Sequence, residues 1–204
     1  MVNNFDKSWA KFLNPESLQH NVKAISLFIC VFEMFKDQLV EKLKMLFSTS
    51  ERFDSASGKI TYEVGQRYKD EVSSRSKYKD EAALLWFRSN SAINDDDIEM
   101  YHKIRMHRNG LTHNMIGYVT KYGVDFDEGL FESLVCIYSK IEKWWFVNFE
   151  LSLSPEMLPD GQDPDDVIPG SVITINLMRD ILLGFEPEKG YYYDTFLKFK
   201  DKKE

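Results

Sequence analysis

The sequence contains few of the residues and motifs that identify common classes of protein. It has two cysteines, Cys30 and Cys136, each inside an apolar helical pattern. This placement predicts small core residues in a reducing compartment better than a disulfide framework, although a disulfide between the two stays open. The sequence also lacks a phosphate-binding glycine loop, a nucleophile elbow and a zinc-ribbon cysteine pattern. Any catalytic centre must therefore be built from other residues.

Long apolar runs are missing as well. The longest nearly apolar run, residues 24–32, lies between Lys23 and Glu33 and is far shorter than the roughly 20 residues that cross a bilayer. The first residues, MVNNFDKSWAKFL, have no basic region that leads into an apolar one, so we expect no signal peptide. We therefore expect a cytoplasmic protein without a membrane partner.

An excess of basic residues is the third absence. The formal net charge is −7 and the pI is near 5.2, which excludes the overall electrostatic pattern of a non-specific nucleic-acid binder. Any contact with nucleic acid must therefore be local. Hydrophobic residues make up 43% and aromatic residues 14% of the 204 positions, enough for one substantial core, or one domain with an appendage.

Apolar residues that recur every three or four positions predict a mostly helical chain. The first helix opens at Asn14-Pro15, an N-cap followed by a proline at the first helical position. Another opens after Asn94, where Asp96 and Glu99 have the spacing of a capping box. The expected helices cover about 14–48, 77–90, 95–115, 127–151 and 172–185, with a tail at 191–204 that continues in helical form.

The remaining segments are predicted to be connections. Residues 48–76 are polar, with a weak helical or strand-like patch around 60–64, and we expect one short helix there. Gly117 and Gly123 indicate a short loop or hairpin, and residues 152–171 hold four of the six prolines among acids and glycines. Residues 172–175 are β-branched enough to permit a strand instead of a helix. The expected fold class is all-α, a bundle of four or more helices with a C-terminal helical extension.

One residue interrupts the apolar stripe of the helix at 95–115. Steps of three or four from Ile104 place a core residue at position 108, which is Arg108. Burial of an unpaired guanidinium costs several kcal/mol. Three explanations compete: the side chain reaches solvent or pairs with a neighbouring carboxylate such as Glu33 or Asp37, the stripe has ended and the cation complements the helix C-terminus, or Arg108 faces a functional cleft.

The surroundings of Arg108 favour the cleft. Residues 102–113 hold Lys103, Arg105 and three of the four histidines without one acid, inside an acidic protein. Gly110 lies in the same segment, and glycine inside a helix often indicates the close approach of another backbone or a ligand. Arg108 and His113 are about 140° apart on an ideal helix. Two copies related by a two-fold axis could bring both pairs together.

The segment Arg108-Asn109-Gly110-Leu111-Thr112-His113 resembles the Arg-x4–6-His motif of the HEPN superfamily (higher eukaryotes and prokaryotes nucleotide-binding), in the form with asparagine after the arginine. Domains of this family are small helical bundles, and the motif lies on a late helix that is followed by one more. On this resemblance residues 1–151 are a HEPN-like bundle domain, and residues 152–204 are a loop rich in proline and aspartate with a helical extension packed on the bundle.

The resemblance implies a metal-independent endoribonuclease without a cofactor, which acts on RNA as a homodimer with a composite active site. It further implies a toxin or antiviral defence effector, with an antitoxin or regulatory protein as a partner. The implied catalytic residues are Arg108, which binds the phosphate, and His113, which transfers protons. Supporting or substrate-binding residues would be Asn109, Arg105, Thr112 and His107.

Some features depart from the family or carry no chemistry. Met115 stands where some toxin members have the tyrosine that a partner enzyme modifies. The three histidines at 102, 107 and 113 lack the i, i+4 spacing of a helical metal site, so we expect no metal. The aromatic runs at 144–146 and 191–193 are predicted to pack rather than to stack on bases. Two alternatives stay open: a non-catalytic HEPN-like module that binds RNA, a nucleotide or a protein, and a helical interaction protein.

Overall fold

The computed structural model describes residues 3–56, 58–159 and 161–201. It is mostly helical, and within these residues the only sheet is one antiparallel hairpin, so the expected helical bundle is confirmed. Short 3₁₀ turns occur at Ser73–Arg75, Pro155–Met157 and Pro164–Asp166, and a π-helical turn occurs at Phe146–Glu150. In chain order the remaining elements are α1 (Asn4–Leu13), α2 (Pro15–Leu46), β1 (Ser48–Asp54), β2 (Lys59–Val64), α3 (Gln66–Glu71), α4 (Lys79–Ser89), α5 (Asp95–His113), α6 (Met115–Thr120), α7 (Glu128–Trp145), α8 (Leu151–Leu153), α9 (Gly170–Leu183) and α10 (Tyr191–Asp201).

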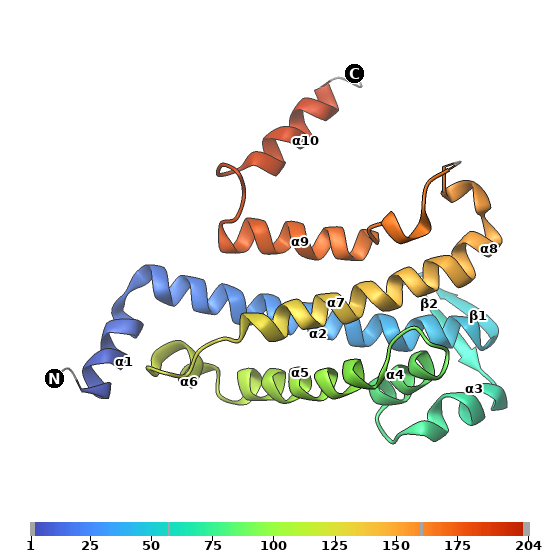
Figure 1. Cartoon of the computed structure of the whole chain (residues 1–204), viewed down its shortest axis with the longest axis horizontal. Helices are drawn as coiled ribbons and strands as arrows, with labels where there is room; N and C mark the ends of the chain where they lie inside the picture. The colour runs from blue at the N-terminus through green and yellow to red at the C-terminus, as the bar shows by residue number, and fades with distance from the viewer. Residues whose placement is uncertain (1–2, 57, 160, 202–204) are drawn as a thin grey trace.

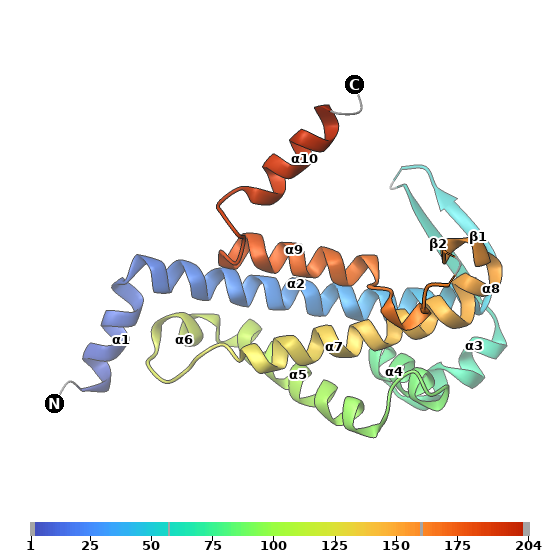
Figure 2. The same ribbon diagram turned by 45° about the horizontal axis from the view of Figure 1, so that its top comes forward.

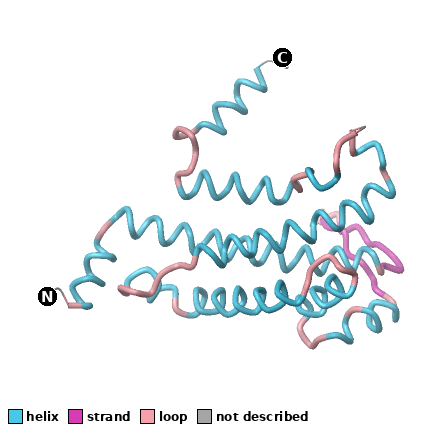
Figure 3. Tube along the Cα trace, in the orientation of Figure 1, coloured by secondary structure: helices cyan, strands magenta, loops and turns pink. Residues whose placement is uncertain are grey.

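Helix α2 is the central element of the bundle (Figure 1). It packs lengthwise against α5, α7 and α9, with α1 and α6 at its start and α4 and β2 toward its end. The helix begins as expected, because the Asn14 Oδ1 accepts the Ser17 N–H at 3.0 Å and Pro15 fills the first position. Figure 3 shows that helices account for nearly all of this arrangement.

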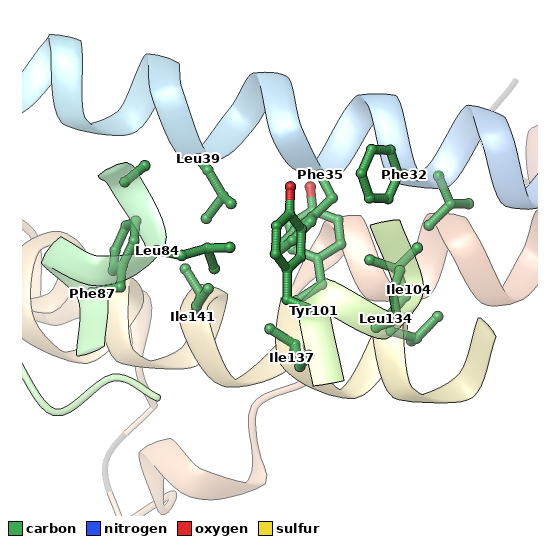
Figure 4. Packing of buried hydrophobic residues seen from close by; sticks show 14 of the residues in the cluster. Phe32, Phe35, Leu39, Leu84, Phe87, Tyr101, Ile104, Leu134, Ile137 and Ile141 are labelled. Atoms are coloured by element: carbon green, nitrogen blue, oxygen red, sulfur yellow. The ribbon is translucent and has the colours of Figure 1, made fainter. Parts of the chain in front are cut away.

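The core is built where α2, α4, α5 and α7 meet (Figure 4). Phe35 of α2 is fully buried, and its ring centroid lies 5.2 Å from that of Tyr138 and 6.2 Å from that of Tyr101. The Tyr101 hydroxyl donates a hydrogen bond to the buried Asp80 carboxylate, which supplies the partner that both polar groups need. Each large apolar side chain buried here contributes about 1.5–3 kcal/mol. This core fixes α5 against α2.

The start of α5 has a capping box at a different position from the expected one. Asn94 and Asp97 cap each other: the Asn94 Oδ1 accepts the Asp97 N–H at 2.9 Å, and the Asp97 carboxylate accepts the Asn94 N–H at 3.1 Å. The expected pair Asp96 and Glu99 does not form it. Asp97 also pairs with Lys140 of α7 at 2.7 Å, so the cap ties α5 to α7.

The prediction of a loop or hairpin around residues 117–123 is wrong for its first part, which belongs to α6. Gly117 is buried, and a Cβ at this position would lie 2.5 Å from the Asn114 side-chain amide. Glycine is therefore present for close packing rather than for a turn. Sequence patterns also did not predict α1. Its Lys11 ammonium donates to the carbonyls of Tyr118 and Val124, both at 2.8 Å, and so attaches α1 to α6.

The segment 48–76 contains more regular structure than expected. It forms the β1–β2 hairpin and α3, with Phe53 opposite Ile60 in the antiparallel register. Both side chains are largely exposed, so the hairpin contributes little to the main core. The strand-like interpretation of the patch around 60–64 is thus the correct one of the two alternatives for that stretch.

The C-terminal segment contains two helices with different surroundings. The predicted helix at 172–185 is observed as α9, which packs on α2 and α7 and buries Val172 and Ile175. Helix α10 projects away from the bundle (Figure 2). Its base is held by the Tyr192 hydroxyl, which donates to the Asp180 carboxylate at 2.9 Å. The aromatic residues of α10 are therefore mostly exposed.

The prediction that both cysteines are core residues is wrong. Cys30 on α2 and Cys136 on α7 are exposed and free. Each lies on the solvent side of its helix, next to positions such as Val31 and Ile137 that are buried, because a helix turns away from the core between apolar positions. None of the helices in the described part of the chain is both long and apolar enough to cross a membrane.

Candidate functional site

The Arg108–His113 segment forms the last turns of α5. Ile104 and Leu111 are fully buried and anchor this part of the helix, whereas Asn109, Thr112 and His113 are exposed. The helix ends at Asn114, whose N–H donates to the Gly110 carbonyl at 2.9 Å. Burial of Leu111 shows that the apolar stripe continues past position 108. The explanation in which the stripe has ended therefore does not hold.

Arg108 pairs with Glu33 of α2, one of the two carboxylates expected as partners. The guanidinium Nη2 donates to a Glu33 carboxylate oxygen, and Nη1 donates to the Asn109 Oδ1 at 3.2 Å. The guanidinium carbon lies 5.6 Å from the centroid of the Phe32 ring. The side chain keeps 25% of its surface exposed, so solvent and ligands can reach the pair.

The Glu33 carboxylate is held by two cations. Lys36, one turn further along α2, also donates to it. Burial raises the pKa of the Glu33 carboxyl, but the hydrogen bonds and positive charges of Lys36 and Arg108 together outweigh burial, so the pKa is lowered from its ordinary value. Arg108 and Lys36 thus form a place that binds one anionic oxygen group, which the carboxylate of Glu33 fills.

The Arg108 Nε–H is the one unsatisfied group of this cluster. Its nitrogen is buried, and within the described residues it has no hydrogen-bond partner. A buried N–H without an acceptor costs about 1–3 kcal/mol. An anion with several oxygens, unlike a single carboxylate oxygen, would supply a second acceptor for the guanidinium.

His113 does not meet Arg108 within one chain. Its imidazole is exposed at the end of α5 and, in the part of the chain that the structure describes, makes no hydrogen bond, ion pair or ring contact. Asn109 and Thr112 lie between the two residues on the helix surface. The Thr112 hydroxyl donates to the Arg108 carbonyl at 2.9 Å, so the side chain of Thr112 is occupied by its own helix.

Two further predicted residues lie on opposite sides of α5. The Arg105 guanidinium carbon stands 4.3 Å from the centroid of the Tyr78 ring, just before α4. His107 instead packs between α2 and the segment that precedes α7: its ring centroid is 5.3 Å from that of Phe28, and its Nε2 accepts the Asp127 N–H at 3.3 Å. The structure therefore places Arg105 near the Arg108 side of the helix and His107 in an aromatic cluster.

The His107 ring is held in its neutral form by its surroundings. Burial lowers the pKa of the imidazole, and the nearby Asp127 carboxylate opposes this shift only in part. The ring of Tyr118, centroid to centroid 5.6 Å away, covers another side. His107 is thus a packing residue of this cluster. Among the described residues no group of three His, Cys, Asp or Glu side chains is arranged to hold a metal ion.

Gly110 is present because of a side chain of the same protein. A Cβ at this position would lie 2.9 Å from the Tyr118 hydroxyl oxygen. The close approach that glycine indicated is therefore that of Tyr118, from the next helix.

Two apolar side chains flank the exposed part of the segment. Met106 on α5 is 74% exposed and Ile116 on α6 is 75% exposed. Met106, Asn109 and His113 fall within about 60° of one another around the helix axis. Neither Met106 nor Ile116 was expected from the sequence to belong to a site. They could have been found in the sequence as apolar residues at helix positions that the periodicity of the core residues assigns to the solvent-exposed face.

Fold and site together define a helical-bundle protein with an arginine–carboxylate pair at the surface and an exposed histidine one and a half turns away. Comparison with protein-family models, with curated proteins and with solved structures gave no match.

Proposed function

We propose that this chain is a metal-independent endoribonuclease of the HEPN type that works as a homodimer, as a toxin or antiviral effector. The observation that carries the proposal is the exposed strip at the end of α5 and the start of α6, where Asn109 and His113 lie in sequence between Met106 of α5 and Ile116 of α6, all four exposed. Exposed apolar side chains that lie together in one patch are typical of surfaces that another protein covers. A second copy on this strip would cover both and bring two copies of His113 together.

Arg108 has the chemistry required for the phosphate. Its guanidinium already binds an anionic oxygen group, that of Glu33, together with Lys36. A phosphodiester that displaces the Glu33 carboxylate would bind the same two cations and offer an acceptor to the unpaired Nε–H. The charge of the pentacovalent transition state is then stabilised where it develops.

The exposed His113 supplies acid–base catalysis. One neutral imidazole takes the proton of the RNA 2′-hydroxyl, and the oxygen attacks the adjacent phosphorus. The bond to the 5′-oxygen breaks, and this oxygen receives a proton from the imidazolium of the second copy. The products are a 2′,3′-cyclic phosphate and a 5′-hydroxyl. Histidine is the side chain used most often to transfer protons in catalysis, and it can serve as the base in one step and as the acid in the other.

One observation favours a second role for the same segment. The Arg108–Glu33 pair satisfies much of the guanidinium within one chain, as expected for a residue that only joins α5 to α2. In that case the chain would be a non-catalytic HEPN-like binding module or a helical interaction protein. The two roles differ in whether substitution of His113, which has no role in packing, changes an activity.

Purified full-length protein would be incubated with labelled RNA in EDTA, beside Arg108→Ala and His113→Ala variants. His102→Ala is the matched control, because this histidine lies on the same helix away from Arg108, where it faces Glu81 at 3.7 Å and the Tyr101 ring at 6.2 Å between centroids. We expect cleavage to cyclic-phosphate ends that falls at least about a hundredfold in both site variants and is unchanged in the control. RNA binding without cleavage would support the non-catalytic binding module instead. A monomer that neither binds nor cleaves RNA would support the helical interaction protein.

A further inference from the structure

A cavity of about 410 Å³ lies between α2 and the start of α4. Lys36 and Lys44 of α2 and Lys77 and Lys79 of the α4 side line it, around the ring of Tyr78. The lining also holds the carboxylates of Asp37, Glu41 and Asp80, so the four lysines leave a local excess of one positive charge in a protein whose net charge is −7. Such a local excess favours an anionic ligand.

The carboxylates of the cavity are mostly engaged. Glu41 pairs with Lys44 one turn away on α2. Asp80 is buried and accepts the hydrogen bond of the Tyr101 hydroxyl. Asp37 is the remaining acid in the lining.

Two lysines of the cavity are available for a ligand. Lys77 and Lys79 are exposed, and among the described residues neither ammonium has an ion pair or hydrogen bond. The Lys77 Nζ lies 4.9 Å from the centroid of the Tyr78 ring. Unlike Lys36 and Lys44, they would therefore give up no ion pair within the chain when a ligand arrives.

The cavity is connected to the Arg108 site by two sets of contacts. Lys36 lines the cavity and also shares the Glu33 carboxylate with Arg108. Arg105, nearly one turn before Arg108 on α5, stacks at 4.3 Å on Tyr78, which is 43% exposed in the cavity wall. A chain of phosphates that passes Arg108 therefore meets Arg105, Lys36 and then the two free lysines.

We propose that this cavity binds phosphate groups of the same RNA strand, beyond the phosphate held at Arg108. The inference rests on the proposed function, because RNA is the ligand. Lys77 and Lys79 contact phosphates, Lys36 is shared between the two sites, and the Tyr78 ring with Arg105 forms a flat cationic and aromatic surface against which a base or sugar can pack.

The test measures binding without cleavage. Full-length wild-type protein and Lys77→Glu/Lys79→Glu would be titrated with single-stranded RNA that carries 2′-O-methyl groups, which removes the attacking hydroxyl. The matched control is Lys23→Glu/Lys189→Glu, which changes the net charge equally at exposed lysines of another cavity, between α2 and the end of α9. Lys77→Gln/Lys79→Gln and thermal unfolding of every variant distinguish weaker phosphate binding from a failure to fold.

We expect the cavity double variant to bind at least about tenfold more weakly, with a salt slope that is shallower by about 0.7 for each phosphate that is no longer neutralised. The Gln variant should weaken binding less, and the control should bind within about twofold of wild type. Equal losses in cavity and control variants, or none in either, would overturn the inference. If the wild type cleaves RNA and the cavity variant binds RNA as well as the wild type does, the cavity is not a phosphate site but the proposed ribonuclease activity stands. If RNA binding depends on the cavity but the wild type does not cleave, the ribonuclease proposal fails and the cavity site stands. No RNA binding by the wild type overturns both.

Discussion

The hydroxyl of Tyr118 lies against Gly110, so close that a Cβ on the glycine would be 2.9 Å from the oxygen and 3.7 Å from the nearest ring carbons. Removal of the oxygen turns this contact into an ordinary one. Glycine inside a helix costs about 1 kcal/mol relative to alanine, so the two effects oppose each other at this position.

We therefore expect Gly110→Ala to stabilise the Tyr118→Phe protein by up to about 1 kcal/mol and to be neutral or destabilising in the wild type. Denaturant unfolding of the wild type, both single variants and the double variant forms a complete cycle. An equal effect of Gly110→Ala on stability in both backgrounds would show that the Tyr118 hydroxyl oxygen does not prevent a side chain at position 110.

The Glu33 pair predicts a dependence of stability on pH. Because the folded pKa of Glu33 is lowered by Lys36 and Arg108, its contribution is present above the ordinary pKa and is lost as pH falls through the folded value. Glu33→Gln should lower the free energy of unfolding by up to about 1 kcal/mol at pH 7, the range of partly exposed pairs, and by close to nothing at pH 3. Asp37→Asn is the control, as its carboxylate has no ion pair among the described residues.

His107 predicts a second dependence, at higher pH. Burial lowers its folded pKa, so the unfolded chain binds the proton more readily. The stability contribution is full above the ordinary pKa near 6.5 and declines as pH falls toward the folded value. We expect wild-type stability to decrease between pH 7 and pH 5 more than that of His107→Phe, with the half-exposed His102→Phe as the control. Parallel curves for wild type and His107→Phe would contradict this.

The exposed strip predicts a dimer that single charges disrupt. Met106→Glu or Ile116→Glu should convert the dimer to a monomer and remove cleavage, because a carboxylate would be buried at the interface. Ile181→Glu on α9, a half-exposed apolar residue elsewhere, should change neither. Sedimentation velocity measures the mass. Retention of the dimer in both strip variants would place the interface on another surface.

Helix periodicity explains what could be predicted. The apolar stripes of α2, α5 and α7 predicted the bundle, and the interruption of the α5 stripe identified Arg108. Glu33 could be named as a candidate partner because it lies on a neighbouring helix of that bundle. The same reasoning failed for Cys30 and Cys136, because apolar neighbours in sequence do not place a residue on the apolar face. It also included His107 in the site through nearness in sequence, although its ring faces Phe28.

Other features depend on contacts between segments far apart in the chain. Gly117 suits a turn and a tightly packed helix equally well in sequence, and only the Asn114 side chain decides between them. The lysine cavity is lined by residues 36–44 together with residues 77–80, and no local sequence pattern predicts that these two segments are neighbours. Whether two copies of His113 meet depends on a second chain and therefore on the tests above.

The two exposed thiols offer a direct way to measure that assembly. Cys30 on α2 and Cys136 on α7 are free and accessible, so the wild-type chain takes a maleimide spin label or fluorophore at natural positions. With either cysteine replaced by serine, the remaining label reports one distance to its own copy across the two-fold axis. Two such distances from different helices would restrict how the protomers are oriented in solution without any added residue.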